Sequence, residues 1–215
     1  MSKLRLKISV SLDGFVAGPD QSVNDPLGKG GMRLHEWVVP LAAWREPHGL
    51  VGGEVNESNA VVLESIANIG ATVMGRNMFG GHPGPWNRDK PWMGWWGKNP
   101  PFRHPVFVVT HYPREPLVLE GNTTFVFVTE GIEAAVALAK RAAGNQDVTL
   151  GGGANVAQQC LRAGLMDEME INLVPILLGA GERLFDGVTD LGGLELVRTV
   201  ATPPVVHLKF IKRRK

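Results

Sequence analysis

A run of three glycines, Gly151-Gly152-Gly153, stands where a short apolar strand at 148–150 leads into a helical sequence at 154–162. Glycines at such a junction let the backbone approach a phosphate closely, and the unpaired N–H groups of the helix start point at it. The run therefore predicts a nucleotide site. An ordinary glycine turn is the alternative.

Three other turns carry residues that could bind a ligand or take part in catalysis. Asp13 follows the first expected strand, Gly75 and Arg76 follow a second, and Thr110 and His111 follow a third. In a mainly parallel sheet these turns open on one edge, where ligands of open α/β sheets bind. The Arg76 guanidinium could reach a phosphate there, and Thr110 and His111 could add a hydroxyl and an imidazole. The alternatives are a solvated arginine and histidine and a turn-forming Asp-Gly.

Composition narrows the class of protein. The chain has 215 residues, of which 44% are hydrophobic and 20% charged, so we expect one soluble globular domain over 1–215. A net charge of +1 argues against nucleic acid as a partner. We find no apolar run of about 18 residues and no signal sequence, so we expect no membrane partner and a cytoplasmic protein. The single Cys160 excludes a multi-cysteine zinc site and is expected to be buried.

Several catalytic motifs are absent from the sequence. It contains neither a Gly-x-Gly-x-x-Gly in the first strand-turn-helix unit nor a P-loop, which disfavours the common dinucleotide fold and the P-loop enzymes. It also lacks a helical histidine pair and a Gly-x-Ser-x-Gly elbow. We therefore expect no metal site and no hydrolytic chemistry.

The elements that must position these turns follow from hydrophobic periodicity. We expect strands at 3–11, 71–74, 106–110, 117–119, 124–129, 148–150 and 167–178, the last interrupted at Pro175, and a closing hairpin of 194–201 and 205–212. We expect helices at 34–45, 54–68, 132–142 and 154–162, and a long loop at 18–31. In the second helix Val55, Val62, Leu63 and Ile66 form the expected apolar stripe, and Gly70 the stop. The alternation predicts a three-layer α/β/α fold around a mixed, mostly parallel sheet.

The segment 85–96 holds four of the six tryptophans and has no regular periodicity. Such a cluster could be a lid that stacks on a planar ligand, or a hydrophobic contact between subunits.

Four sequence blocks carry a resemblance to a known family. They are Ser-Leu-Asp-Gly at 11–14, Thr-Val-Met-Gly-Arg-Asn-Met-Phe at 72–79, Thr-Leu-Gly-Gly-Gly-Ala at 149–154, and Asp-Glu-Met-Glu at 167–170 leading to a loop at 174–185. In this order they resemble the reductase domain of the bacterial bifunctional riboflavin-biosynthesis protein, and equally the stand-alone dihydrofolate-reductase-like proteins. The zinc-deaminase half of the riboflavin enzyme is absent.

The resemblance implies a dihydrofolate-reductase-like fold and NADPH as hydride donor. It assigns the pyrophosphate to the glycine run, the 2′-phosphate to Arg76, the adenosine half to Thr110 and the substrate side to Asp13. The full implied cofactor site is Gly75, Arg76, Thr110, His111, Gly151, Gly152, Gly153, Ala154, Asn155, Leu178 and Gly179.

Our leading hypothesis is an NADPH-dependent reductase of a small heterocyclic substrate, pyrimidinone or pterin-like, or of a carbonyl compound. Asp13 is the candidate catalytic residue, to orient substrate or relay a proton. The alternatives are a non-catalytic NADP(H)-binding protein and a flavin-dependent oxidoreductase. The terminal strands and the tryptophans also make us expect a homodimer.

Overall fold

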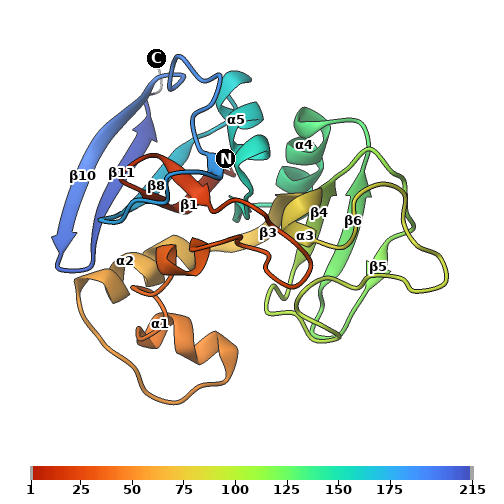
Figure 1. Ribbon diagram of the computed structural model, residues 1–215. Coiled ribbons are helices and arrows are strands. Elements are labelled where there is room, and N and C mark those ends of the chain that lie inside the picture. Colours follow the sequence, from red (N-terminus) through yellow and green to blue (C-terminus); the bar gives the residue numbers. More distant parts are fainter. Residues whose placement is uncertain (1, 214–215) are drawn as a thin grey trace.

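The computed structural model describes residues 2–213. Within them one nine-stranded sheet has the order β10-β11-β8-β1-β7-β3-β4-β6-β5 (Figure 1). Its strands are β1 (Leu4–Ser11), β3 (Ile69–Gly75), β4 (Pro105–Val109), β5 (Leu117–Val118), β6 (Thr124–Val128), β7 (Asp147–Leu150), β8 (Glu168–Val174), β10 (Leu194–Thr202) and β11 (Val205–Lys212). A small second sheet pairs β2 (Phe15–Ala17) with β9 (Glu182–Arg183).

The centre of the large sheet is parallel. β1 pairs in parallel with β7 and β8, β3 with β7 and β4, and β4 with β6. β5 and the terminal β10–β11 hairpin are antiparallel. The carboxyl ends of the parallel strands therefore meet at one edge, which confirms that the turns after 11, 75, 109 and 150 open together.

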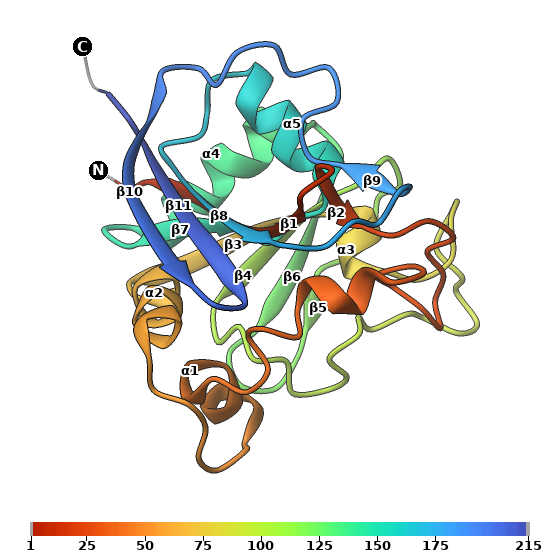
Figure 2. The same ribbon diagram turned by 60° about the vertical axis from the view of Figure 1, so that its left-hand side comes forward.

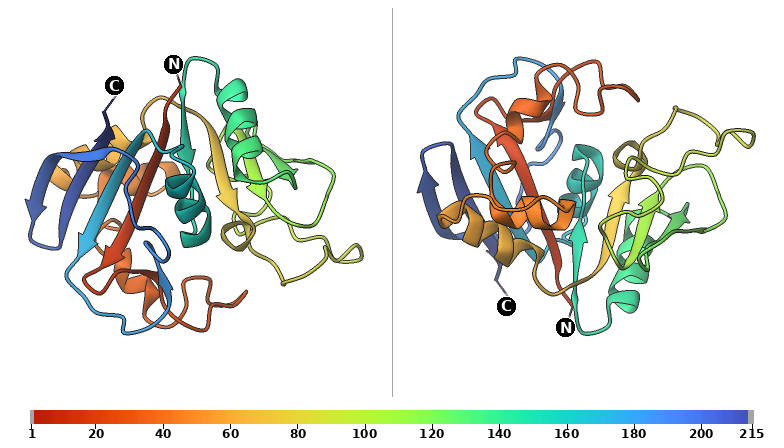
Figure 3. Two further views of the ribbon diagram at one scale, coloured as in Figure 1. Left: turned by 90° about the horizontal axis from the view of Figure 1, so that it is seen from above. Right: turned by 90° about the horizontal axis from the view of Figure 1, so that it is seen from below.

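Helices cover both faces of this sheet. α4 (Ile132–Ala143) and α5 (Ala154–Arg162) pack on one face, whereas α1 (Ala42–Arg45) and α2 (Glu57–Ile66) lie on the other (Figure 2). Seen from above, α4 and α5 stand in front of the strands, and seen from below α2 does (Figure 3). Ala135 and Ala139 of α4 are fully buried, and their small side chains let the helix backbone approach the sheet closely. The three-layer α/β/α prediction is confirmed.

The predicted helix at 34–45 is wrong as a continuous element. A 3₁₀ turn, η1 (Gly31–Leu34), is followed by irregular turns, then α1, then a second 3₁₀ turn, η2 (Glu46–His48). Pro40 explains the break, because it lacks an N–H and disfavours helical geometry at the residue before it. Trp37 and Leu41 are nonetheless buried as the spacing suggested.

The second predicted helix, 54–68, is shorter in the structure. α2 starts after Asn56, whose side chain accepts a hydrogen bond from the Asn59 N–H at 3.0 Å. It ends at Ile66, and Gly70 lies inside β3, so the predicted stop was wrong.

The predicted apolar stripe of this helix was wrong except at Val62, which is 2% exposed. Val55 is 81% exposed, and Leu63 and Ile66 are about half exposed. The helix instead buries Ser58 and Asn59 beside two valines. The physical reason is that α2 covers a polar strip of the sheet, so its inward face is polar too.

The predicted strand 167–178 was too long. β8 ends at Val174, immediately before Pro175, which has no N–H to give to a strand ladder. The chain then bends, and the Ile176 carbonyl accepts from the Leu12 N–H at 2.9 Å. This bend brings residues 176–179 next to the loop that follows β1.

Candidate functional site

Two adjoining cavities lie at the carboxyl edge of the sheet, on either side of the N-terminus of α5. One has a volume of about 500 Å³ and the other about 450 Å³. Asn77 and Gly153 line both, so together the cavities form one elongated cleft. We call the larger one the ring cavity and the smaller one the outer cavity.

The glycine run forms the floor between them. Gly152 has φ +93°, a conformation that side chains rarely adopt, and its peptide bond to Gly153 is cis. A Cβ on Gly152 or Gly153 would meet no protein atom within 4 Å, so the space above them is open. The Gly75 N–H donates to the Gly152 carbonyl at 2.9 Å, and a Cβ on Gly75 would press on Val156 at 3.1 Å. Glycine at 75 thus permits the close approach of two turns.

The N-terminus of α5 adds donors to this floor. No side chain caps the helix, and the first intrahelical bond there runs from the Ala157 N–H to the Gly153 carbonyl. The N–H groups of the first turn therefore remain available beside an open space. Together with the helix dipole they make a favourable position for an anion.

The structure brings the predicted cofactor residues together, apart from Leu178 and Gly179. The outer cavity is lined by Gly75, Arg76, Thr110, His111, Gly153 and Asn155. The ring cavity is lined by Gly151, Gly152, Gly153 and Ala154.

Arg76 is held by its own loop. Its guanidinium donates to the carbonyls of Gly80 and of His82, the latter at 2.8 Å, and lies 3.6 Å from the centre of the Trp86 ring. Its buried Nε has no hydrogen-bond partner. Burial and the nearby Arg114 lower the pKa of Arg76.

Arg114 is a cation that sequence analysis missed. It donates to the Trp92 carbonyl at 2.6 Å and lies 5.0 Å from the Trp86 ring centre. Within residues 2–213, neither Arg114 nor Arg76 forms an ion pair with a carboxylate. Arg76 lines the outer cavity and Arg114 lies near Arg76, so the positive charge at this end of the cleft suits an anionic group such as a phosphate.

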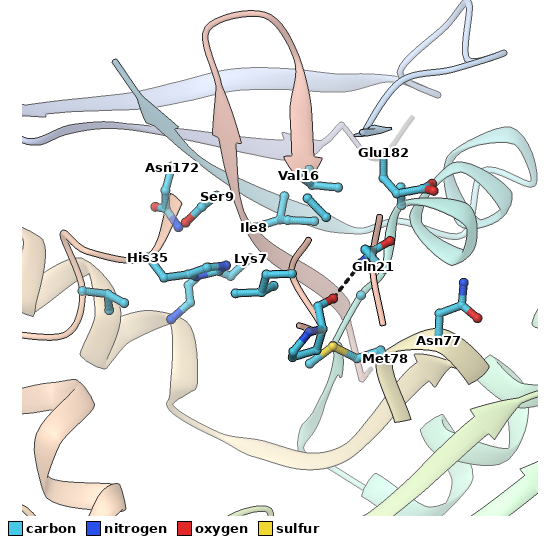
Figure 4. A pocket seen from close by; sticks show the side chains of 18 of the residues that line it. Lys7, Ile8, Ser9, Val16, Gln21, His35, Asn77, Met78, Asn172 and Glu182 are labelled. Atoms are coloured by element: carbon cyan, nitrogen blue, oxygen red, sulfur yellow. Dashed lines mark hydrogen bonds between the residues drawn. The ribbon is translucent and has the colours of Figure 1, made fainter. Parts of the chain in front are cut away.

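The ring cavity is walled largely by aromatic and apolar side chains. Its walls include Trp37, Trp44, Trp95, Trp96, Met78, Val16 and Val38. Lys7, Ser9 and Asn172 reach it from the sheet, and His35 from the segment before α1 (Figure 4). Gln21 and Glu182 are exposed at its rim.

Lys7 is the central titratable group of this cavity. It stands on β1 in register with Glu170 of β8, and the described chain gives its amine no ion pair within 4.0 Å. Burial lowers the pKa of Lys7 to about 8, against the opposing attraction of Glu170. Burial and the charge of Lys7 lower the pKa of His35, which lies beside it (Figure 4). Lys7 can therefore hold or release a proton near neutral pH.

A buried hydrogen-bond chain supports Asn172. The amide oxygen of Asn172 lies 2.7 Å from His207 Nδ1, and His207 Nε2 lies 2.9 Å from the Ser58 hydroxyl. Because an amide oxygen only accepts, His207 carries its proton on Nδ1 and accepts from Ser58. Burial lowers the pKa of His207 to about 4, so the ring is neutral. The chain leaves the Asn172 amide nitrogen free to donate into the cavity.

Asp13, the candidate catalytic residue, lies outside the lining of both cavities. Its carboxylate accepts from the N–H groups of Leu178 at 3.1 Å and Gly179 at 2.7 Å, and from the Ser11 hydroxyl at 2.5 Å. The Ser11 hydrogen bond, with those two N–H groups, lowers its pKa to about 2. This geometry favours the alternative of a turn residue, which ties the loop after β1 to the loop after β8.

The tryptophan segment folds back onto its own sheet. Trp86, Trp92 and Trp96 pack against the cluster around Phe79, and Trp95 and Trp96 line the ring cavity. The Trp92 and Trp95 indole N–H groups donate to the carbonyls of Phe79 and Met78, at 2.9 and 3.0 Å. Trp95 and Trp96 therefore lie where the lid hypothesis requires them, and the subunit contact stays an open alternative.

Sequence analysis missed the polar residues of the ring cavity: Lys7, Ser9, His35, Asn172 and Glu182. The sequence does contain a pattern that could have indicated these buried polar residues. β1, β8 and β11 each carry polar residues at every second position, and registers place Ser9, Asn172 and His207 in one row. A lysine or histidine within a sheet covered on both faces has to be buried, and buried polar rows need a partner or a function.

Comparison with family models decides the family. The model described as the RibD C-terminal domain matches residues 2–208. The chain belongs to this family. Membership confirms the resemblance seen in the four sequence blocks and supports a reductase type of function. No curated protein matches the chain.

Solved structures show the same fold. A putative riboflavin biosynthesis protein from Shewanella sp. PV-4 has a TM-score of 0.59 at 21% identity, with 99% of each chain covered. A second structure is that of the Thermotoga maritima diaminohydroxyphosphoribosylaminopyrimidine deaminase/5-amino-6-(5-phosphoribosylamino)uracil reductase. Its TM-score is 0.57 at 15% sequence identity, and the match covers 99% of this chain and 57% of that chain. Dihydrofolate reductase from Enterococcus faecalis, complexed with NADP(H), has a TM-score of 0.52 at 14% sequence identity. The match covers 99% of this chain and 97% of that chain.

Three further observations concern sites and environment. Cys160 is buried as predicted, and burial raises its pKa to about 12. Among the described residues no group of three or more His, Cys, Asp or Glu side chains is arranged to hold a metal ion. No helix of residues 2–213 is long and apolar enough to cross a bilayer.

Proposed function

We propose that this protein is an NADPH-dependent reductase that transfers a hydride to a small heterocyclic or carbonyl substrate. The observation that carries the proposal is the open glycine floor at the start of α5, set between two cavities of similar volume. A dinucleotide has this layout, with two bulky halves joined by a pyrophosphate bridge.

The residues present fit NADPH. The N–H groups of Gly153 and the first turn of α5 would hold the pyrophosphate, and Thr110 and His111 would line the adenosine half. Arg76, which lines the outer cavity, would face the 2′-phosphate, and the nearby Arg114 would add positive charge. The bound cofactor would supply a hydride in the ring cavity.

The chain itself would supply the proton that the reduction needs. Lys7 lines the ring cavity and its pKa is about 8, so at neutral pH it carries a proton that it can give up. Asn172 would hold the substrate through its amide N–H, and the indoles of Trp95 and Trp96 would exclude water from the reacting atoms. We thus move the proton donor from Asp13 to Lys7, and keep Asp13, Leu178 and Gly179 as the contact that shapes the neighbouring loop.

Calorimetric titration with NADPH and NADH, followed by an absorbance assay with pterins, pyrimidinones and quinones, tests this function. We expect tight NADPH binding and NADPH oxidation in step with reduction of at least one acceptor. Tight binding without oxidation would favour the non-catalytic NADP(H)-binding alternative. A yellow protein that oxidises its substrate without NADPH would favour the flavin alternative.

Arg76→Ala tests the 2′-phosphate assignment. Loss of a charge-assisted hydrogen bond should weaken NADPH binding by about tenfold to a hundredfold and leave NADH nearly unchanged. Arg162→Ala, at the far end of α5, is the matched control and should affect neither cofactor. Equal losses for both cofactors would contradict the assignment.

A further inference from the structure

The two ends of the cleft differ in charge. The outer cavity is lined by Arg76, which has no carboxylate partner among the described residues, and Arg114 lies near Arg76. Among the described residues that line the ring cavity there is no arginine, and the charged ones are Lys7 and Glu182. Glu182 is exposed at the rim, where its carboxylate would repel an entering anion. The charged side chains therefore favour a phosphate group at the outer cavity over one in the ring cavity.

The walls of the ring cavity specify the shape of its ligand. Four indoles and Met78 line the cavity, and a planar ring gains burial and aromatic contacts among such side chains. A volume of about 500 Å³, shared with a nicotinamide ring, leaves room for a compact ring system.

The polar groups specify one edge of that ring. Asn172 offers its amide N–H because His207 occupies its oxygen at 2.7 Å. The Ser9 oxygen accepts from the Trp37 indole at 3.1 Å, which leaves the Ser9 hydroxyl proton free. Protonated Lys7 is a third donor. Three donors on one wall call for acceptors on the ligand, and a ring carbonyl supplies them.

We propose that the substrate is an uncharged, planar ring compound that bears a ring carbonyl and no phosphate group. This inference rests on the proposed reductase function and narrows its substrate class. It separates this chain from the phosphoribosylamino compound in the name of the Thermotoga maritima enzyme.

Calorimetry on the full chain saturated with NADP⁺ tests the proposal with three probes: lumazine, the same ring with a ribityl chain, and the ribityl compound with a terminal phosphate. We expect the two uncharged probes to bind and the phosphate to weaken binding at least tenfold. Equal or tighter binding of the phosphorylated probe would overturn the proposal, and so would failure of all three probes to bind. Failure of NADP⁺ itself to bind would instead count against the proposed function.

Two variants make the test independent of folding. Gln21→Arg places a cation on the exposed rim, so it should improve binding of the phosphorylated probe at least fivefold and leave lumazine unchanged. Asn172→Leu should weaken lumazine at least tenfold and leave NADP⁺ binding intact. Val55→Ala, on the exposed surface, is the control for both. No gain in Gln21→Arg would contradict the idea that missing charge excludes phosphate.

Discussion

Lys7 shows how a single residue acquires its chemistry from its surroundings. On an isolated strand its amine would be an ordinary solvated cation, but a sheet covered on both faces removes most of its water. The attraction of Glu170 only partly compensates, and the pKa falls to about 8. The amine can therefore exchange a proton near neutral pH, as the proposed role of proton donor requires.

Lys7→Met should lower kcat by about a hundredfold or more while NADPH binding changes little, because general acids contribute on that scale. In the wild type, kcat should fall as pH rises through about 8, where the donor loses its proton. Lys7→Arg retains a charged group across this range, so that fall should disappear. If the pH profile of either variant kept the same fall, Lys7 would not be the donor.

Asp13 illustrates the opposite outcome for a residue chosen from its position after a strand. Its carboxylate is fully used by Ser11, Leu178 and Gly179. We expect Asp13→Asn to reduce kcat/KM by less than tenfold and to increase proteolytic cleavage near residue 178. A hundredfold loss of kcat in a variant with an intact loop would return Asp13 to the chemistry.

At the level of elements, the position of the glycine floor could be predicted because three glycines follow an apolar strand and precede a clear helical sequence, although an ordinary turn has the same pattern. The inward face of α2 could not. The helix packs on Glu168, Glu170 and Lys209 of the sheet, where Glu64 pairs with Arg198 at 2.6 Å. An apolar periodicity search misreads a helix whose partner surface is polar. Pro40 already indicated a break in the predicted helix at 34–45. The helical spacing of Trp37 and Leu41 nevertheless led to the prediction of a continuous helix.

Gly152 and Gly153 make a matched pair of substitutions in this floor. Gly152→Ala should destabilise the fold by about 1 to 3 kcal/mol, because φ +93° is strained for alanine. Gly153 has φ −84°, so Gly153→Ala should fold normally and weaken NADPH binding by placing a methyl group in the open space. Unfolding titrations and calorimetry separate the two effects. Unchanged cofactor binding in Gly153→Ala would place the pyrophosphate elsewhere.

The chain from Ser58 through His207 to Asn172 makes stability depend on pH. The folded pKa of His207, about 4, lies below its ordinary value, so the unfolded chain binds the proton first as pH falls. Stability should drop between about pH 6.5 and 4, by up to about 3 kcal/mol. Urea unfolding of the wild type and of His207→Gln at a series of pH values between 6.5 and 4 measures this loss of stability. An identical slope in the variant would show that other groups cause the loss.

For the whole molecule, alternation of strands and helices was enough to predict the layers and the parallel centre. The same alternation could not predict where the loops 18–31 and 80–104 lie. Their sequences have no hydrophobic periodicity, because tertiary contacts rather than regular secondary structure determine their conformation. These loops close the ring cavity with Leu27, Trp95 and Trp96. The lining of the ring cavity therefore could not be predicted from the sequence, whereas most residues that line the outer cavity and the glycine floor could.

The homodimer remains a proposal at this scale, as does a cytoplasmic location. Edge strand β10 exposes Leu196 and Val197, by 53% and 56%. Light scattering should give twice the 23.3 kDa mass of one chain, and Leu196→Glu with Val197→Lys should halve it. A wild-type mass of one chain would contradict the dimer without affecting the cleft.

The most direct test of the central claim is a crystal structure of the protein with NADPH. The predicted density runs along the cleft, with the pyrophosphate within hydrogen-bond distance of the N–H groups of Gly153 and Ala154, the 2′-phosphate beside Arg76, and the nicotinamide in the ring cavity near Lys7. Density for NADPH away from the start of α5, or none at saturating NADPH, would contradict it.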